Sequence, residues 1–372
     1  MQKFLFAILC FVCLSGTVGG QTVEKPPLRV VVAGLSHDHV HAVLRRHVRG
    51  DLQIVGIAES NRELAKRHAD RYGFEIDLVS NSLADLLEMT EPEVVCDYGS
   101  IYGHLNTVQV CAPRGVDVMV EKPLAVSLEH ARVMERLAAK HGINLITNYE
   151  TTWYASHLAA KRLLTEAATW GEIRKIVVHD GHPGPAEIGC SQEFLAWLTD
   201  PLLNGGGALT DFGCYGANLS TWFMNGQKPT SVTAVTQQIK PDRYPQVDDE
   251  ATLVLTYPKA QAIVQASWNW NYNRKDIEIY CQRGFVHCLN SKQMRTMRSP
   301  SNEVLEHVAQ PIAAPHGDPF EYLAEVVRGT IQVKPTDLSS LQNNVTVVEI
   351  LEAAKISADT SRTVRMDELT AD

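Results

Sequence analysis

The sequence has no run of basic residues and no hydrophobic segment long enough to cross a membrane. It contains 34 Lys and Arg against 43 Asp and Glu, a formal net charge of −9, and this balance argues against a polyanionic partner such as a nucleic acid. The apolar run 4–14 falls short of the roughly 20 residues that a membrane helix needs. We therefore expect a globular protein with no membrane span.

Cysteine is scarce in the part of the chain that is expected to fold. Eight cysteines become six if the first 20 residues are removed, and their spacings match neither a disulfide framework nor a zinc site. We expect them to be small buried residues, although an oxidising compartment would permit disulfides. The six are Cys96, Cys111, Cys190, Cys214, Cys281 and Cys288.

The first 20 residues have the pattern of a secretory signal peptide. Lys3 supplies a minimal positive charge, 4–14 is an apolar core, and 15–20 is rich in small residues, with cleavage expected after Gly20. This segment has no twin-arginine pair, which favours export of the unfolded chain. The sequence thus predicts a secreted or periplasmic protein.

The chain from residue 28 has the pattern of a nucleotide-binding βαβ unit. Two apolar runs, 28–34 and 52–58, predict buried parallel strands, and the stretch between them, which reaches Val48, predicts a helix. The second run ends at Glu59, where an acid accepts hydrogen bonds from the adenosine ribose of a dinucleotide. This acid favours NAD over NADP, because a carboxylate repels a 2′-phosphate.

The loop after the first strand lacks most of the glycines of the dinucleotide fingerprint. Of the three glycines in that fingerprint, only Gly34 is present, and Ser36 and His39 occupy the other two positions. Backbone N–H groups at a helix N-terminus can still bind a pyrophosphate. We therefore expect this loop, including His37, to contact the nucleotide, although its side chains make it bulkier than a glycine-rich loop.

The triplet Glu121-Lys122-Pro123 follows another apolar run, 115–120, which predicts a further strand of the same sheet. Ligands bind at the carboxyl edge of such sheets, where Lys122 could polarise or protonate a substrate oxygen during hydride transfer. Pro123 suits the first turn of a helix predicted over 124–141. Taken alone, the triplet fits equally well a lysine that merely ends a strand.

The second half of the chain is rich in strands that are joined by short turns. Three glycines, 205–207, lead to Asp211 and Tyr215, whose spacing would place both side chains on one face of a helix. The strand-rich pattern predicts an antiparallel sheet, so the fold class is α/β, a Rossmann domain followed by a domain with an open sheet. The predicted strands are 173–178, 231–236, 251–257, 260–268 and 275–281.

With these motifs in this order, the chain resembles the Gfo/Idh/MocA oxidoreductases, the family of glucose–fructose oxidoreductase and inositol 2-dehydrogenase. The resemblance covers nearly everything after Leu28. It implies a dinucleotide-binding Rossmann domain over 28–147 and an α/β substrate-binding and oligomerisation domain over 148–368, with an open, mostly antiparallel sheet. It also implies that the protein could form a homo-oligomer.

The resemblance implies roles for the site residues. Lys122 and Tyr215 would share the proton transfer, and Asp211 would orient the reacting hydroxyl; tyrosine stands where most members have histidine. His104 could border the cofactor or cap the helix that follows it. The residues implied to contact NAD are Gly34, Ser36, His37, His39, Glu59, Tyr98, Ser100, His104, Glu121 and Lys122.

The implied substrate is a small carbohydrate, namely a sugar, polyol or glycoside. Asn148 matches a family position, but Glu150 stands where many members have an arginine, which disfavours a phosphorylated or carboxylated substrate. His182 follows the first strand of the second domain, near the family's substrate position. Trp268 is expected on a strand with Trp270, where it could stack on a sugar or simply pack within the sheet.

A metal-dependent hydrolase is a different possibility. His37, His39 and His41 alternate after the first strand, as metal ligands do in barrel hydrolases. Such a barrel needs eight βα units, which the strand-rich second half does not offer, so no metal is expected. Further ligands would have come from His104, His179, Asp180 and His182.

The sequence allows more than one interpretation of whether the protein catalyses a reaction and of how its cofactor is regenerated. A sugar-binding protein could have kept the fold and lost catalysis, which the degraded glycine loop favours and the intact Lys122, Asp211 and Tyr215 oppose. Export also makes free NAD scarce. A tightly bound cofactor would then be regenerated by a second substrate, or oxidation and reduction would occur on one glycoside, as in redox-neutral NAD-dependent glycosidases.

Overall fold

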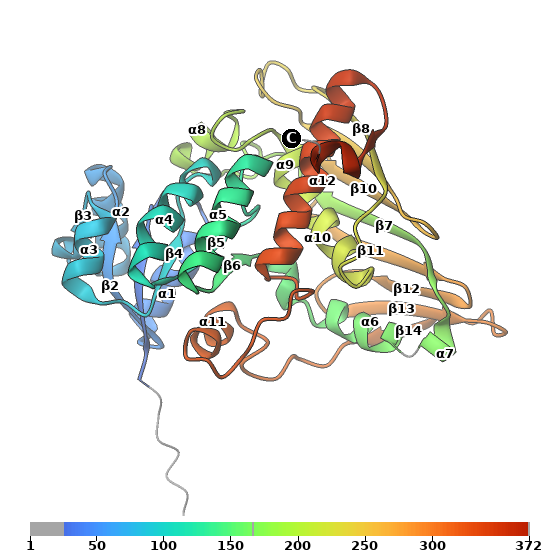
Figure 1. Cartoon of the computed structure of the whole chain (residues 1–372), viewed down its shortest axis with the longest axis horizontal. Coiled ribbons are helices and arrows are strands. Elements are labelled where there is room, and N and C mark those ends of the chain that lie inside the picture. Colours follow the sequence, from blue (N-terminus) through green and yellow to red (C-terminus); the bar gives the residue numbers. More distant parts are fainter. Residues whose placement is uncertain (1–25, 166, 371–372) are drawn as a thin grey trace, which may run out of the picture.

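The computed structural model describes residues 26–165 and 167–370, so the predicted signal peptide lies outside the described residues. The chain forms two sheets that lie side by side, each with its own helices (Figure 1). The first sheet and its helices make the blue-to-green half of Figure 1, and the second sheet, whose strands run from green (β7) to orange (β14), makes the other half. The predicted α/β fold class is confirmed.

The first sheet is a six-stranded parallel sheet in the order β3-β2-β1-β4-β5-β6. The order reverses direction between β1 and β4, and ligands bind at such a switch point. Its strands are β1 Leu28–Ala33, β2 Leu52–Ala58, β3 Val79–Ser80, β4 Val94–Asp97, β5 Asp117–Glu121 and β6 Leu145–Asn148. Its helices are α1 Val40–Arg49, α2 Arg62–Tyr72, α3 Leu83–Thr90, α4 His104–Cys111 and α5 Leu128–His141.

The helix predicted over 124–141 begins four residues later than expected. The hydroxyl of Ser127 accepts a hydrogen bond from the backbone N–H of His130, which makes Ser127 the N-cap of α5. Pro123 is therefore not in the first turn of a helix. Residues 123–126 instead form a buried loop between β5 and α5, and this loop carries the segment after Lys122 toward the second domain.

The second sheet has nine strands in the order β14-β13-β12-β11-β7-β10-β9-β8-β15. All its pairs are antiparallel except β7 with β10. The strands are β7 Ile173–Gly181, β8 Ser231–Gln237, β9 Glu250–Thr256, β10 Gln261–Ser267, β11 Arg274–Cys281, β12 Gly284–Cys288, β13 Gln293–Arg298, β14 Leu305–Val308 and β15 Val364–Arg365. The remaining helices are α6 Ala155–Thr165, α7 Ala167–Trp170, α8 Gln192–Leu198, α9 Ala208–Asp211, α10 Gly213–Phe223, α11 Pro319–Val327 and α12 Leu341–Thr360.

Helices α10 and α12 cover one face of the second sheet (Figure 1). Along β9 and β10, buried residues alternate with partly exposed ones, as expected for a sheet with one face in the core. Two late segments return to the first domain: α12 contacts α5 and β6, and α11 adds Phe320, Leu323 and Val326 to the Rossmann core. The two domains are thereby joined by packing as well as by the chain.

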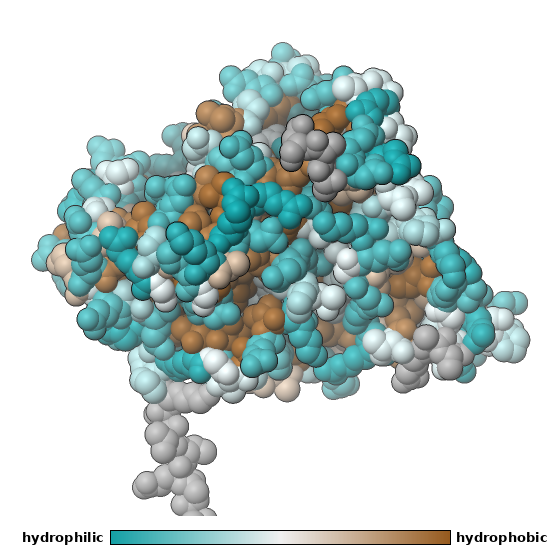
Figure 2. Space-filling view, in the orientation of Figure 1, coloured by the Kyte–Doolittle hydropathy of each residue, from teal (hydrophilic) through white to brown (hydrophobic). Residues whose placement is uncertain are grey.

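The surface is mostly hydrophilic, and hydrophobic residues show mainly between the helices in the middle of the face in Figure 2. None of the described helices is long and apolar enough to cross a membrane. All six cysteines of the described residues are free thiols, and four of them are buried. This agrees with the expectation of small buried residues for most of the set.

Candidate functional site

A cavity of about 360 Å³ lies where the carboxyl edge of the first sheet meets the second domain. Lys122 follows β5 directly, and Asp211 ends α9, so the two domains contribute one residue each to the floor of the cavity. The walls include His37, His39, His182, Cys190, Phe212, Tyr215 and Lys275. The predicted catalytic residues Lys122, Asp211 and Tyr215 are thus together.

Lys122 and Asp211 form a buried ion pair. Lys122 Nζ contacts Asp211 Oδ1 and also donates to the Asp211 carbonyl at 3.0 Å, while Trp268 Nε1 donates to Asp211 Oδ2 at 2.9 Å. Burial alone would lower the pKa of Lys122, but the Asp211 carboxylate raises it above its usual value. Burial would raise the pKa of Asp211, but Lys122 and His182 lower it. Both groups are therefore charged at neutral pH.

Asp211 and Tyr215 are not on one helix, as the sequence suggested. Helix α9 ends at Asp211, Phe212 interrupts it, and α10 begins at Gly213. The glycines before α9 permit a close approach: a Cβ on Gly207 would lie 1.8 Å from the Asp248 carbonyl oxygen. The Asp248 carboxylate accepts the N–H groups of Gly207 and Leu209, which fixes the start of α9.

Tyr215 lies between two lysines. Lys122 Nζ is 5.2 Å and Lys275 Nζ is 4.7 Å from the centre of its ring, and the residue is 1% exposed. Burial, with the carboxylate of Glu150, raises the pKa of the Tyr215 phenol well above its usual range. A raised pKa favours the protonated phenol, which suits the proton-donating part of the role that the sequence predicts for Tyr215 alongside Lys122.

His182 lines the cavity as a neutral side chain. Its Nδ1 accepts a hydrogen bond from the Gly184 N–H at 3.0 Å, so the neutral ring carries its proton on Nε2. Burial lowers the pKa of His182 to about 4. His182 therefore offers an N–H donor, and its ring edge rests on Phe212 with centroids 4.8 Å apart.

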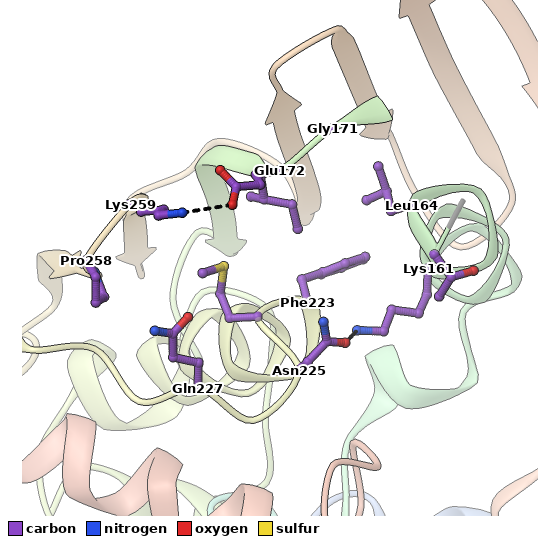
Figure 3. A pocket seen from close by; sticks show the side chains of 12 residues that line it. Lys161, Leu164, Gly171, Glu172, Phe223, Asn225, Gln227, Pro258 and Lys259 are labelled. Atoms are coloured by element: carbon purple, nitrogen blue, oxygen red, sulfur yellow. Dashed lines mark hydrogen bonds and ion pairs between the residues drawn. The ribbon is translucent and has the colours of Figure 1, made fainter. Parts of the chain in front are cut away.

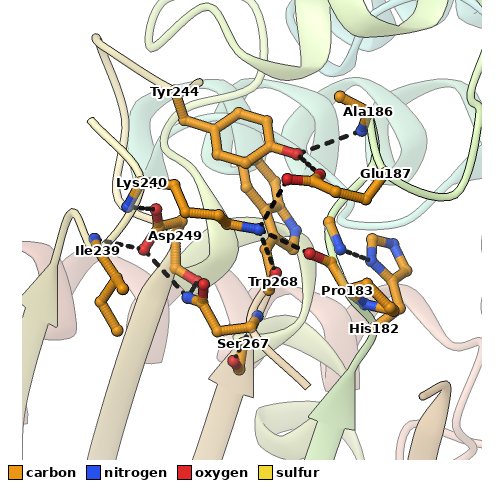
Figure 4. A network of polar contacts seen from close by, with 12 residues as sticks. His182, Pro183, Ala186, Glu187, Ile239, Lys240, Tyr244, Asp249, Ser267 and Trp268 are labelled. Atoms are coloured by element: carbon orange, nitrogen blue, oxygen red, sulfur yellow. Dashed lines mark hydrogen bonds and ion pairs between the residues drawn. The ribbon is translucent and has the colours of Figure 1, made fainter. Parts of the chain in front are cut away.

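The loop that follows His182 is held by Lys240, which lies on the connection between β8 and β9 (Figure 4). Lys240 Nζ donates to the carbonyls of Pro183 at 2.6 Å and Trp268 at 2.7 Å, and it pairs with Glu187. Tyr244 adds a hydrogen bond to Glu187. This network joins the loop after His182 to Trp268. Because Trp268 donates a hydrogen bond to Asp211, the network also helps to hold Asp211 in position.

Two further ionisable residues at the site, Lys275 and Asp180, were not predicted from the sequence. Lys275 pairs with Glu150, and across the β7–β11 ladder it stands opposite Asp180. Asp180 is 1% exposed and, within the described residues, neither of its carboxyl oxygens has a hydrogen-bond partner. Burial raises the pKa of Asp180 well above its usual range, which favours its neutral form. No local motif marks Lys275, because only the pairing of two distant strands brings it here.

The loop after β1 has the features of a nucleotide site. Gly34 has φ +76°, and a Cβ there would lie 2.7 Å from the backbone of Gly99, so only glycine fits. Glu59 accepts the N–H groups of Leu35 at 2.8 Å and Asn61 at 2.7 Å. Within residues 26–165 and 167–370, the N–H groups of Ser36 and Asp38 make no hydrogen bond. These free donors fit a pyrophosphate.

His37 and His39 of this loop lie in different environments. His39 is exposed, and its Nδ1 lies 2.9 Å from Glu121 Oε2. His37 borders the cavity but is 1% exposed, and its ring packs against Phe194 and Trp197 of α8. His37 therefore joins the loop to the second domain, whereas His39 is exposed beside Glu121.

The other residues expected at the cofactor lie beneath this loop. Tyr98 is 2% exposed, and its backbone accepts the N–H of His37 at 2.9 Å. His104 is fully buried, begins α4, and has its Nδ1 3.1 Å from the carbonyl of Leu124, so it neither caps the helix by its side chain nor faces the solvent. Ser100 is half-buried in the same turn. Tyr98 and His104 are thus buried residues that support the loop at the carboxyl edge of the first sheet.

Two of the three expected substrate residues have structural contacts instead. Trp268 is fully buried, follows the end of β10, and supports Asp211, so it cannot stack on a sugar. Asn148 lines neither cavity beside the site. Its amide donates to Glu121 at 2.9 Å and its carbonyl accepts from Trp153 at 3.1 Å. His182 does line the cavity.

The barrel that a metal-dependent hydrolase would need is absent, because the described second half forms an open sheet. His37, His39 and Glu121 nevertheless offer ligand atoms that lie within 4.8 Å of one another. His179 belongs to a separate group with Asp276 and Glu278. The absence of a catalytic metal stays a prediction, which metal analysis of the purified protein would check.

Four buried histidines predict a loss of stability in acid. Burial lowers the pKa of His68, His157 and His182 to about 4, and that of His37 well below its usual value. In the unfolded chain these groups titrate near about 6.5, so below that pH unfolding takes up protons. We expect the melting temperature to be flat above pH ~6.5 and to fall toward pH ~4. An unchanged melting temperature across this window would contradict the assignment.

A further hollow, of about 370 Å³, lies beside α6 and the end of α10 (Figure 3). Lys161 donates to Asn225 Oδ1 at 2.7 Å and to the carbonyl of Trp222 at 2.5 Å, which ties down the last turn of α10. Across the hollow, Lys259 pairs with Glu172. None of the residues predicted to be catalytic lines it.

Two family models match the chain. The oxidoreductase family model with an NAD-binding Rossmann fold matches residues 28–149, and the GFO/IDH/MocA C-terminal domain model matches residues 157–287. The trans-1,2-dihydrobenzene-1,2-diol dehydrogenase of Xenopus tropicalis is 25% identical over 317 residues, which cover 82% of this chain and 89% of that protein. The human protein of the same name is 26% identical over 229 residues, which cover 62% and 64%.

Solved structures have the same fold. An aldose-aldose oxidoreductase from Caulobacter crescentus, complexed with glycerol, superposes with a TM-score of 0.76 at 20% identity over 91% of this chain and 99% of that one. An inositol dehydrogenase homologue from Azotobacter vinelandii, complexed with NAD⁺, gives a TM-score of 0.76 at 17% identity over 91% and 97%. Both domains of this chain are matched, and it is an NAD-dependent oxidoreductase that belongs to the Gfo/Idh/MocA family.

Proposed function

We propose that this protein is an exported oxidoreductase that transfers a hydride between NAD and a hydroxyl-bearing carbon of a sugar, polyol or glycoside. The observation that carries the proposal is the buried Lys122–Asp211 ion pair at the carboxyl edge of β5, in the wall of a cavity where the two domains meet. The relatives support the substrate class, because a dihydrodiol, an inositol and an aldose appear in their names. All three carry several hydroxyl groups.

The residues of the cavity act on the oxygen of the reacting carbon. NAD supplies the acceptor for the hydride when it is bound. Lys122 and Tyr215 both line the cavity, where the ammonium and the phenol hydroxyl would donate hydrogen bonds to a substrate oxygen and stabilise negative charge that develops on it. In the oxidising direction Lys122 would take up the proton of the substrate hydroxyl while it passes one of its own protons to the Asp211 carboxylate that it contacts, and in the reducing direction the same protons would move back to the substrate oxygen. Asp211 keeps Lys122 in place and, because it also lines the cavity, would orient the reacting hydroxyl.

We propose further that the cofactor stays bound between turnovers. The backbone N–H of Ser191 donates to Asp38 Oδ2 at 3.0 Å, and His37 packs on Phe194 and Trp197. The segment around α8 thus closes over the nucleotide loop, and a bound dinucleotide would have to move it to leave. A retained cofactor also suits export, which the pattern of residues 1–20 supports.

A retained cofactor needs a partner reaction. We propose that a second sugar regenerates it, or that one glycoside is oxidised, loses its substituent by elimination and is then reduced. Both cycles return the hydride and need no free NAD. The partly exposed face of the second sheet, with residues such as Val235 at 63% exposure, supports the proposal that two copies pair through it.

Glu59 is expected to set the choice of cofactor. Each of its oxygens accepts one backbone N–H and keeps a lone pair for a ribose hydroxyl. Glu59→Ala should weaken NAD binding about 10- to 100-fold, since hydrogen bonds to a charged group contribute about 1.5–3 kcal/mol. Glu59→Gln is the matched control. Calorimetric titration in which the wild type binds NADP more tightly than NAD would overturn this.

The proposal of a retained cofactor is tested by denaturing the purified protein and analysing the released small molecules by mass spectrometry. We expect NAD in an amount that is stoichiometric with the chain. A preparation that releases no nucleotide and exchanges added NAD freely would leave an ordinary dehydrogenase. A preparation that neither releases nor binds NAD would contradict the oxidoreductase proposal itself.

A further inference from the structure

A second cavity, of about 420 Å³, adjoins the catalytic cavity, and the proposed reaction does not use it. The two cavities share His182 and Lys275 in their walls. Each is within the range of about 300–1,000 Å³ that is typical of small-molecule sites. A substrate whose reacting carbon lies beside Lys122 could therefore extend past His182 and Lys275 into the second cavity.

The charges that line the second cavity are already paired. Lys275 pairs with Glu150. Arg274 Nε donates to Asp276 Oδ1 at 2.6 Å, and its guanidinium lies 4.6 Å from the centre of the Trp270 ring. Hydrogen bonds from His179, His287 and Arg274 lower the pKa of Asp276 against the effect of burial, so it stays ionised. With both cations neutralised, the cavity is poorly suited to a phosphate or a carboxylate.

The rim of the second cavity offers neutral recognition groups. Tyr272 is 55% exposed, Asn273 is exposed, and both line the cavity. Neither side chain makes a hydrogen bond within the described residues. Tyr154, also in the wall, donates its hydroxyl to Glu150 at 2.6 Å and keeps its ring at the cavity. Aromatic faces beside free amides and paired charges suit a neutral ring that carries hydroxyl groups.

We propose that the second cavity is a subsite for a neutral sugar ring, so that the substrate is a disaccharide or glycoside and not a free monosaccharide. This rests on the proposed function of the catalytic cavity. One ring is oxidised beside Lys122, and the ring or substituent linked to it occupies the subsite between Tyr154 and Tyr272.

The subsite is linked to the catalytic groups by the chain. Trp268, which donates to Asp211, and Tyr272 lie on the same short connection between β10 and β11. Lys275 follows that connection, lines both cavities and contacts the ring of Tyr215. Binding energy from the distal ring can thus be used at the reacting carbon. We expect occupation of the subsite to raise kcat as well as to lower KM.

The test compares Tyr272→Ala with the wild type. Glucose, methyl glucoside, maltose and cellobiose are each mixed with the NAD-loaded protein, and kcat/KM is taken from the single-turnover rise in the absorbance of the reduced nicotinamide at several sugar concentrations. We expect the wild type to prefer a disaccharide, and Tyr272→Ala to lose about tenfold on it, the effect of about 1.4 kcal/mol of stacking. The kcat/KM of Tyr272→Ala on the monosaccharide should stay within about twofold of the wild-type value. Tyr280→Ala, an exposed tyrosine on β11 that lines neither cavity, is the matched control.

Four results would overturn the subsite. If the wild type shows no preference for disaccharides, or if Tyr272→Ala slows every sugar equally, the subsite is wrong and the proposed function stands. If Tyr272→Ala changes only the molar mass in light scattering, the cavity is a contact between two copies. If no sugar reduces NAD with any variant, the proposed function fails and the subsite fails with it.

Discussion

Replacing Lys122 by methionine is expected to lower kcat about 100- to 10,000-fold, the contribution of a general acid–base group. The ammonium is the one cation that the first domain, within its described residues, places on the floor of the catalytic cavity, next to Asp211. Methionine keeps the length of the side chain and removes the charge and the proton. The measurement is single-turnover reduction of bound NAD by the preferred sugar.

The same substitution will also destabilise the protein, contrary to what its position at a strand edge suggests. Both partners are less than one-tenth exposed, and removing one leaves Asp211 as a buried unpaired charge, which costs about 3–5 kcal/mol. The double variant Lys122→Met/Asp211→Asn keeps an acceptor for Trp268 and removes that charge. We expect it to regain stability but not turnover. A double variant with near-wild-type turnover would show that Lys122 is structural only.

Replacing Tyr215 by phenylalanine is expected to lower kcat about 100-fold while KM changes little, because only the hydroxyl is lost. The ring keeps its contacts with Lys122 and Lys275 and its edge-to-face contact with Tyr149, whose ring centre is 5.3 Å away. The fold should therefore be intact. Steady-state kinetics on one sugar, with melting temperatures measured in parallel, would check both statements.

Tyr149→Phe provides the control for this variant. Tyr149 is equally buried and touches Tyr215, but it does not line the cavity. Removing its hydroxyl should leave kcat unchanged. Equal losses in the two variants would assign the effect of Tyr215→Phe to packing, and the phenol would lose its role as a hydrogen-bond donor to the substrate oxygen.

The sequence predicted the elements whose signal is local. Apolar runs such as 28–34 and 115–120 match β1 and β5, because a parallel strand that is buried on both faces must be apolar throughout. The position of Lys122 at the carboxyl edge of the first sheet could be predicted because an apolar strand comes directly before it. The start of α5 was misplaced because the capping serine, Ser127, gives a weaker signal than the proline before it.

The roles of individual site residues depended on contacts between distant segments. Trp268 was a candidate sugar platform because its burial beneath Asp211 is set by the packing of β10 on α9, which no local pattern records. Asn148 matched a family position but braces Glu121. Lys275 and Asp180 became visible only when the β7–β11 register placed them opposite each other. The position of the Tyr215 ring between two lysines of different domains likewise could not be seen in any local pattern.

The central claim is that hydride moves between a sugar carbon and NAD that is held by this chain. The most direct test is to mix the purified, NAD-loaded protein with candidate sugars, without free NAD, and to record the absorbance of reduced nicotinamide through a single turnover. We expect the signal to rise with a hydroxyl-bearing substrate, to rise more slowly when the reacting carbon carries deuterium, and to fall when a carbonyl sugar is added. A sugar that is converted while the nicotinamide signal stays constant, with no isotope effect, would contradict the claim.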